Sequence, residues 1–166
     1  MKRETAWKKA LRLFFLLFLT NLVGYVGSTF ITPEGIDWSG TLIESRLTPP
    51  NFCFTLVWTV LYFLMGIAGW LVWNKATPRP FVMLLAFNLL WPFLYFYLRE
   101  PVFALLDIVV MIYFIIRTIQ VFRPVSRSAA YLMLPVLLWS MFAFYLNTII
   151  VLYNTQIGVW LGFISG

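Results

Sequence analysis

Five apolar segments, each about as long as a bilayer is thick, restrict this chain to an all-α membrane fold. They run from about residue 11 to 31, 52 to 73, 81 to 98, 102 to 122 and 129 to 153. A helix that crosses a membrane needs roughly 20 mostly apolar residues. Residues 1–166 are therefore predicted to form a single domain. We expect an integral membrane bundle of five transmembrane helices, with a long loop between the first and second helices.

The composition supports this and excludes several kinds of chemistry. Hydrophobic residues make up 62% of the chain and charged residues only 11%, which is too apolar for a soluble domain. Cys53 is the only cysteine and there is no histidine. Disulfides, Cys/His zinc sites and histidine-based catalytic triads are thus excluded. We expect no metal and no cofactor.

Positive charges predict the orientation in the membrane. Ten of the twelve Lys and Arg residues lie before or at the start of the first segment, between the second and third, or at the end of the fourth segment and in the link that follows it. Lys and Arg are retained on the cytoplasmic side. We therefore expect a cytoplasmic N-terminus, with the first loop and the C-terminus outside, in a bacterial inner or cell membrane. The net charge of +6 follows from this asymmetry, so membrane lipid is the expected partner and nucleic acid is not.

The first loop, from Thr32 to Pro49, is the one long connection. Its sequence predicts a turn followed by a short helix through Glu44. Long ordered loops often act as lids, but a solvated connector anchored at the interface by Trp38 fits the sequence equally well. Pro49 and Pro50 end the loop and begin the second segment.

The second segment places aromatic and small residues near one helical face, at steps of three and four residues. These residues are Trp58, Tyr62, Gly66, Gly69 and Trp73. The aromatic rings flank a gap that another backbone or a flat ligand can approach. Ordinary helix packing explains the same spacing, so both interpretations stay open here.

Polar residues in the third and fourth segments must find partners inside the bundle, because lipid supplies none. Asn88 shares a stripe with Trp91 and is expected to point inward, either to join helices or to contact a ligand. Asp107 is the only carboxylate deep in an apolar segment. Such a residue suggests function by default, although a structural role as a protonated or hydrogen-bonded group is the alternative.

The fifth segment carries Pro135, Trp139, Ala143, Asn147 and Asn154 along one side. Ala143 leaves room beside Trp139, whose indole is a flat amphipathic ring with one hydrogen-bond donor. This pattern fits half of a pocket for a flat aromatic ligand. Packing in the core or at the membrane interface is the alternative for such a tryptophan.

The order and spacing of these short motifs resemble the TspO/MBR family, the tryptophan-rich sensory proteins related to the mitochondrial translocator protein. The resemblance covers most of the chain. Its marks are the run VWTVLYFLMG from Val57, Asn88 with Trp91 and Pro92, ALLD from Ala104 to Asp107, and finally Pro135, Trp139, Phe142, Ala143, Leu146, Asn147 and Asn154.

The resemblance implies a membrane protein that binds porphyrins, notably protoporphyrin IX, and similar flat lipophilic ligands beneath the first loop. It implies a sensory or regulatory role in tetrapyrrole or stress metabolism. Trp58 and Trp139 match the tryptophans that the family uses in light-dependent porphyrin breakdown. The ligand-binding residues implied are Trp38, Pro49, Pro50, Trp58, Tyr62, Asn88, Trp91, Asp107, Trp139, Phe142, Ala143, Leu146 and Asn147.

Two other functions remain open at this point. One is a light- and oxygen-dependent enzyme that degrades porphyrins, and the other is a transporter of tetrapyrroles or lipids. Five segments without an internal repeat argue against a secondary transporter. A homodimer is a family-level expectation only, since the segment around Ala86 lacks a second small residue four positions away. No Lys or Arg follows Arg127, so the cholesterol motif proposed for the family is not supported.

Overall fold

Helices make up the fold over residues 5–163, the range that the computed structural model describes. Within that range, five helical stretches are long and apolar enough to cross a membrane, which confirms the predicted all-α fold of five membrane helices. The elements are α1 (Ala6–Ser28), α2 (Pro33–Ser39), α3 (Asn51–Leu71), α4 (Arg79–Pro92), the π-helix η1 (Phe93–Tyr97), α5 (Pro101–Phe122), α6 (Arg127–Leu132), α7 (Leu134–Asn154) and α8 (Gln156–Trp160).

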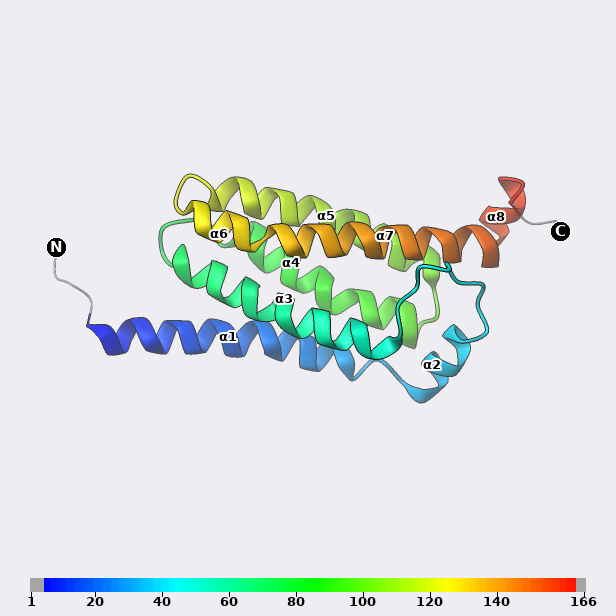
Figure 1. Cartoon of the computed structure of the whole chain (residues 1–166), viewed down its shortest axis with the longest axis horizontal. Helices are drawn as coiled ribbons and strands as arrows, with labels where there is room; N and C mark the ends of the chain where they lie inside the picture. The colour runs from blue at the N-terminus through cyan, green and yellow to red at the C-terminus, as the bar shows by residue number, and fades with distance from the viewer. Residues whose placement is uncertain (1–4, 164–166) are drawn as a thin grey trace.

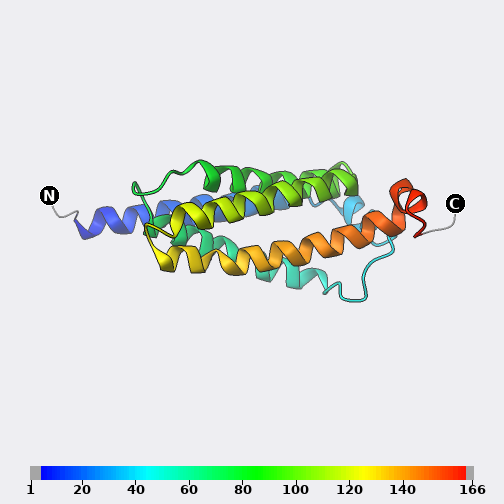
Figure 2. The same ribbon diagram turned by 90° about the horizontal axis from the view of Figure 1, so that it is seen from above.

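The long helices run side by side and define two ends of the molecule (Figure 1). Helix α1 packs against α3 and α4, α4 packs against α5, and α5 packs against α7. The α3–α4 and α5–α6 links lie at one end, which we call the basic end. Helix α2, the loop that follows it and α8 lie at the opposite end, which we call the lid end (Figures 1 and 2).

The helix within the first loop ends earlier than the sequence suggested. The prediction of a helix through Glu44 is wrong, because α2 spans Pro33–Ser39. The Thr32 hydroxyl accepts a hydrogen bond from the Gly35 N–H at 3.0 Å and caps the helix, with proline at its first position. The first membrane helix is also displaced toward the N-terminus, since α1 runs from Ala6 to Ser28.

Proline at position 92 ends the regular part of the third membrane helix. Proline has no N–H and disturbs the backbone ladder of an α-helix. Here the chain widens into η1, and the Leu98 N–H donates to the carbonyl of Phe93, five residues earlier, at 2.9 Å. Single π-helical turns of this kind often lie at functional sites. The turn directs Tyr95 inward, where it is buried.

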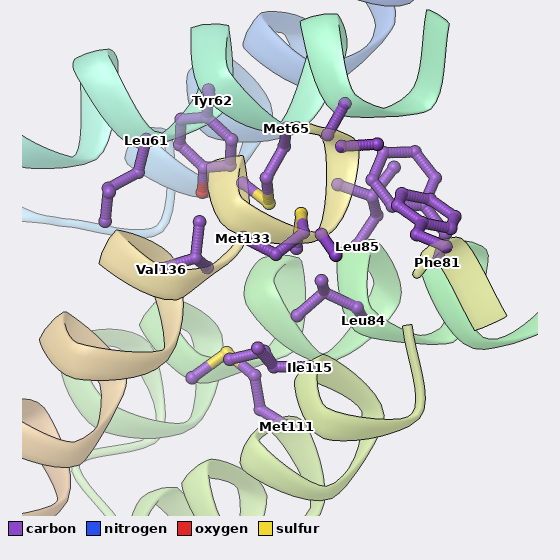
Figure 3. Close-up of a cluster of buried hydrophobic side chains, with 14 of the residues drawn as sticks. Leu61, Tyr62, Met65, Phe81, Leu84, Leu85, Met111, Ile115, Met133 and Val136 are labelled. Atoms are coloured by element: carbon purple, nitrogen blue, oxygen red, sulfur yellow. The ribbon is translucent and has the colours of Figure 1, made fainter. Parts of the chain in front are cut away.

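The hydrophobic core lies between α3, α4, α5 and α6 (Figure 3). Met65, Met111 and Met133 meet there beside Leu84 and Ile115, and all five are almost fully buried. Methionine fills irregular gaps well because its side chain is unbranched. Since α3 packs against α6 near the basic end and touches α7 only sparingly, the two membrane helices α3 and α7 are left less closely packed toward the lid end.

The glycine face of α3 serves helix packing. A Cβ atom on Gly66 would lie 2.9 Å from side-chain atoms of Leu17 and Thr20 on α1. Glycine therefore lets α1 and α3 approach closely at this level. Gly66 therefore serves helix packing, which is one of the two interpretations of this stripe. Trp58 and Tyr62 lie nearer the lid end and are described with the candidate site below.

Candidate ligand-binding site

Helix α2 covers the lid end by resting on η1. The Trp38 ring contacts the Tyr95 ring edge to face, with centroids 5.5 Å apart. Gly35 is buried against the backbone carbonyl of Phe96, and a Cβ atom at this position would collide with that oxygen. The first loop is thus an ordered cover and not a solvated connector at this point.

The rest of the loop is fastened to α7. The Ile43 N–H donates to Asn154 Oδ1 at 2.8 Å, and Asn154 Nδ2 donates to the Ile43 carbonyl at 2.9 Å. Ser45 Oγ and Tyr145 Oη lie 3.1 Å apart and share a further hydrogen bond. Between them, desolvation raises the pKa of the Glu44 carboxyl. Folding of the loop therefore becomes more favourable as the pH falls through the titration of Glu44.

An aromatic stack leads from the lid into the bundle. The rings of Trp91 and Tyr95 are parallel with centroids 5.0 Å apart, and Trp38 caps Tyr95 from the lid side. Phe96 meets Trp91 edge on at 5.9 Å. Stacked and edge-to-face pairs of this kind hold rings in fixed positions. They present a rigid aromatic wall beneath the cover.

A second cluster joins three helices. The Tyr62 hydroxyl on α3 donates to Asn88 Oδ1 on α4 at 3.3 Å, and Asn88 Nδ2 donates to Met111 Sδ on α5 at 3.1 Å. Asn88 therefore joins helices, which is one of the two roles the sequence left open. Trp58 lies against Tyr62 with ring centroids 5.7 Å apart.

A layer of buried polar atoms lies toward the lid end, and these atoms have no hydrogen-bond partner among the described residues. They include Nε1 of Trp91, both carboxyl oxygens of Asp107, and both amide atoms of Asn147. Asp107 lies six residues into α5, and Asn147 lies seven residues before the end of α7. At 1.5 Å per residue, both lie roughly 10 Å below the lid end. An unpaired buried polar group costs about 1–3 kcal/mol, so this layer needs partners.

The α7 wall of the site is aromatic and apolar. Trp139 contacts Phe142 on its own helix, with centroids 5.5 Å apart, and Phe54 on α3 at 5.7 Å. Phe54 lies one helical turn before Trp58, so Trp139 approaches α3 near that residue. Nε1 of Trp139 is buried without a partner among residues 5–163. Ala143 and Leu146 continue the same helix toward Asn147, half-buried and buried respectively.

The structure brings most of the sequence-predicted residues to this region, and the two prolines lie where the sequence predicted, at the junction of the loop and the second membrane helix. Pro49 and Pro50 lie where the loop joins α3, and the Pro50 carbonyl accepts a hydrogen bond from the Cys53 N–H at 2.9 Å. Pro49 and Pro50 thus set the start of α3. The sequence placed Asn154 on the pocket side of the fifth segment, but it assigned neither Tyr95 nor Tyr145 to the site. Tyr95 could have been included because it shares the helical stripe of Asn88 and Trp91.

These features define a class of protein: a five-helix membrane bundle with aromatic walls and unpaired polar atoms beneath a closed loop. Within residues 5–163 no three His, Cys, Asp or Glu side chains gather where they could hold a metal ion. Flat lipophilic molecules with a few polar atoms suit such surroundings.

The chain belongs to the TspO/MBR family, whose model matches residues 15–152. It is 36% identical to the tryptophan-rich protein TspO of Chlorobaculum tepidum, over 89% of this chain and 98% of that protein. It is 35% identical to the protein of the same name from Archaeoglobus fulgidus, over 80% of this chain and 90% of the relative. It is 33% identical to the human translocator protein, over 74% of this chain and 78% of that protein. The family supports a sensory or binding role in a membrane.

Proposed function

We propose that this protein binds a porphyrin, with protoporphyrin IX as the reference ligand, or a similar flat lipophilic molecule within the bundle beneath α2. The observation that carries the proposal is the polar layer of Trp91, Asp107 and Asn147, which is buried and lacks partners among the described residues. A ligand with polar atoms on an apolar aromatic body supplies both kinds of contact. Its role is sensory: the occupied and unoccupied forms differ, and that difference regulates tetrapyrrole or stress metabolism.

Residues of three helices would hold the ligand. Trp91 on α4 and Trp139 on α7 each offer an aromatic ring and a buried indole N–H without a partner among the described residues. Asp107 and Asn147 would take the polar atoms of the ligand. Trp38 would close the site from above through its contact with Tyr95.

The test is a titration of the purified protein with protoporphyrin IX, followed by quenching of tryptophan fluorescence. Wild type is expected to show saturable quenching. Asn147→Leu, which keeps the side-chain volume and removes both amide atoms, is expected to weaken binding about ten-fold, the loss of one buried polar contact. Thr148→Val on the neighbouring lipid-side position is the control and should bind as wild type does. Quenching that never saturates in wild type would refute the proposal.

Light- and oxygen-dependent porphyrin breakdown is the second candidate function. It is favoured by the position of Trp139, an electron-rich indole that forms part of the proposed ligand wall. Illumination of the porphyrin complex in the presence of dioxygen, with the porphyrin absorbance followed over time, tests it. Trp58→Phe and Trp139→Phe are compared with wild type. Loss of porphyrin at the same rate in both variants would remove these two residues from a catalytic role.

A further inference from the structure

An open groove runs along the side of the bundle between α3 and α7. It has a volume of about 580 Å³ and is lined on α3 by residues between Leu56 and Leu64, and on α7 by residues between Pro135 and Phe142. The lining residues are all apolar. Leu56, Val60 and Leu138 are 64%, 50% and 67% exposed, so the groove faces outward. Since α3 and α7 are membrane helices, it opens toward lipid acyl chains.

The groove exists because its two helices take other neighbours. Helix α3 packs against α1 and, near the basic end, against α6, whereas α7 packs against α5. Between them, side chains of modest size such as Val57 and Val60 leave the space open. Within the described part of the chain, no hydrogen bond joins α3 to α7, and the contact between them is apolar and aromatic, as for Phe54 with Trp139.

Trp139 forms the inner boundary of the groove. Its ring lines the groove, yet its Nε1 atom is buried and unpaired in the described structure. The same side chain therefore lines the lipid-facing groove and also carries a buried indole N–H that lacks a partner among the described residues. Phe54 and Phe142 brace the ring from both helices.

The lid end offers a less open route. Asn154 holds Ile43 by two hydrogen bonds, Tyr145 bonds to Ser45, and Gly35 is pressed against η1. We propose that the lipophilic ligand reaches its site sideways from the bilayer, through the α3–α7 groove, and that Trp139 is the side chain that must move to admit it. This inference rests on the proposed ligand-binding function and adds the route to it.

The test measures rates and not only affinity. Wild type and variants are reconstituted in phosphatidylcholine nanodiscs, mixed with vesicles loaded with protoporphyrin IX, and followed by porphyrin fluorescence. Val60→Trp fills the groove and is expected to slow association about ten-fold, as for binding that must wait for a conformational change. Dissociation should slow equally, so the equilibrium affinity should change little. That unchanged affinity also shows that the site is folded.

Two further variants make the test specific. Leu106→Trp adds the same bulk at a lipid-exposed position on α5 outside the groove, and should associate as wild type does. Asn154→Ala loosens the loop and should leave the association rate unchanged. If Val60→Trp associates as fast as wild type, or if Asn154→Ala is faster, the ligand passes the lid and the lateral route is wrong. A wild type that never binds saturably overturns the proposed function together with the route.

Discussion

Asn88 shows how one buried amide can hold a membrane bundle together. Lipid offers no hydrogen bonds, so a polar side chain inside the bundle must be matched by another helix. Here one amide links Tyr62 on α3 with Met111 on α5, and it does so from α4. Because Asn88 is buried in the core, its main role is to stabilise the bundle. Its hydrogen bond also positions Tyr62, against which Trp58 packs.

We predict that Asn88→Leu destabilises the bundle by about 1–2 kcal/mol, because the buried Tyr62 hydroxyl loses its partner. The measurement is thermal unfolding in detergent. Tyr62→Phe is the matched variant, since it removes only the hydroxyl and leaves Asn88 bonded to Met111. It should cost less than Asn88→Leu, and the reverse order would contradict this account.

Gly35 is the residue that permits α2 to rest on η1. We predict that Gly35→Ala lifts the lid, because the added methyl group would collide with the Phe96 carbonyl. Limited proteolysis of the loop between residues 40 and 48 should then become faster. Gly40→Ala is the control, because a Cβ atom there would lie no closer than 3.4 Å to its neighbours and the backbone is α-helical. Equal cleavage of the two variants would argue against the steric explanation.

Among the elements, α7 combines two tasks. It carries Trp139 and Asn147 of the proposed ligand wall, and it also carries Tyr145 and Asn154, which hold the loop. Asn154 lies seven residues beyond Asn147, which is two helical turns on the same face. One helix therefore holds the first loop through Asn154 and also carries Asn147 of the buried polar layer.

We predict that Asn154→Ala frees the loop segment around Ile43, since it removes both hydrogen bonds to that residue. Hydrogen–deuterium exchange of residues 40–48 should rise clearly, while exchange in α3 and α5 stays low. Thr148→Val on the same helix is the control, because the Thr148 hydroxyl donates only to the Phe144 carbonyl of α7. Unchanged exchange in Asn154→Ala would mean that α2 alone holds the loop.

The elements also show what the sequence could and could not predict. Long apolar runs predict the membrane helices, because the length and hydrophobicity of a membrane span depend on local sequence. The Ile43–Asn154 pair depends on a backbone amide of a loop meeting a side chain more than a hundred residues later. The sequence around Ile43 does not indicate that its backbone amide will bond to a distant side chain. The contact of Gly35 with the Phe96 carbonyl likewise joins residues far apart in the sequence, so only the structure reveals it.

At the scale of the whole molecule, the two ends differ in how many Lys and Arg residues they carry. Lys8 and Lys9 at the start of α1, Lys75 and Arg79 beside the α3–α4 link, and Arg123 and Arg127 at the α5–α6 link lie toward the basic end (Figure 1). Cations near membrane helix ends stay in the cytoplasm. We therefore propose that the basic end is cytoplasmic and that the lid faces the opposite side.

We predict that cysteines at the two ends differ in access from outside the cell. In a Cys53→Ser background, Arg46→Cys should react with a membrane-impermeant maleimide in intact cells, because residue 46 is exposed in the loop. Lys75→Cys, equally exposed at the basic end, should react only after the cells are lysed. The opposite pattern would reverse the orientation.

Helix α7 is continuous from Leu134 to Asn154, so it connects the level of Trp139 in the membrane with the loop at the lid end. If ligand binding tilted α7, the Asn154 amide would move with the helix, and so would the backbone at Ile43 that it holds. The exposed loop would then change shape without touching the ligand. Occupancy of a site buried in lipid would in this way become a signal that a second protein can detect in water.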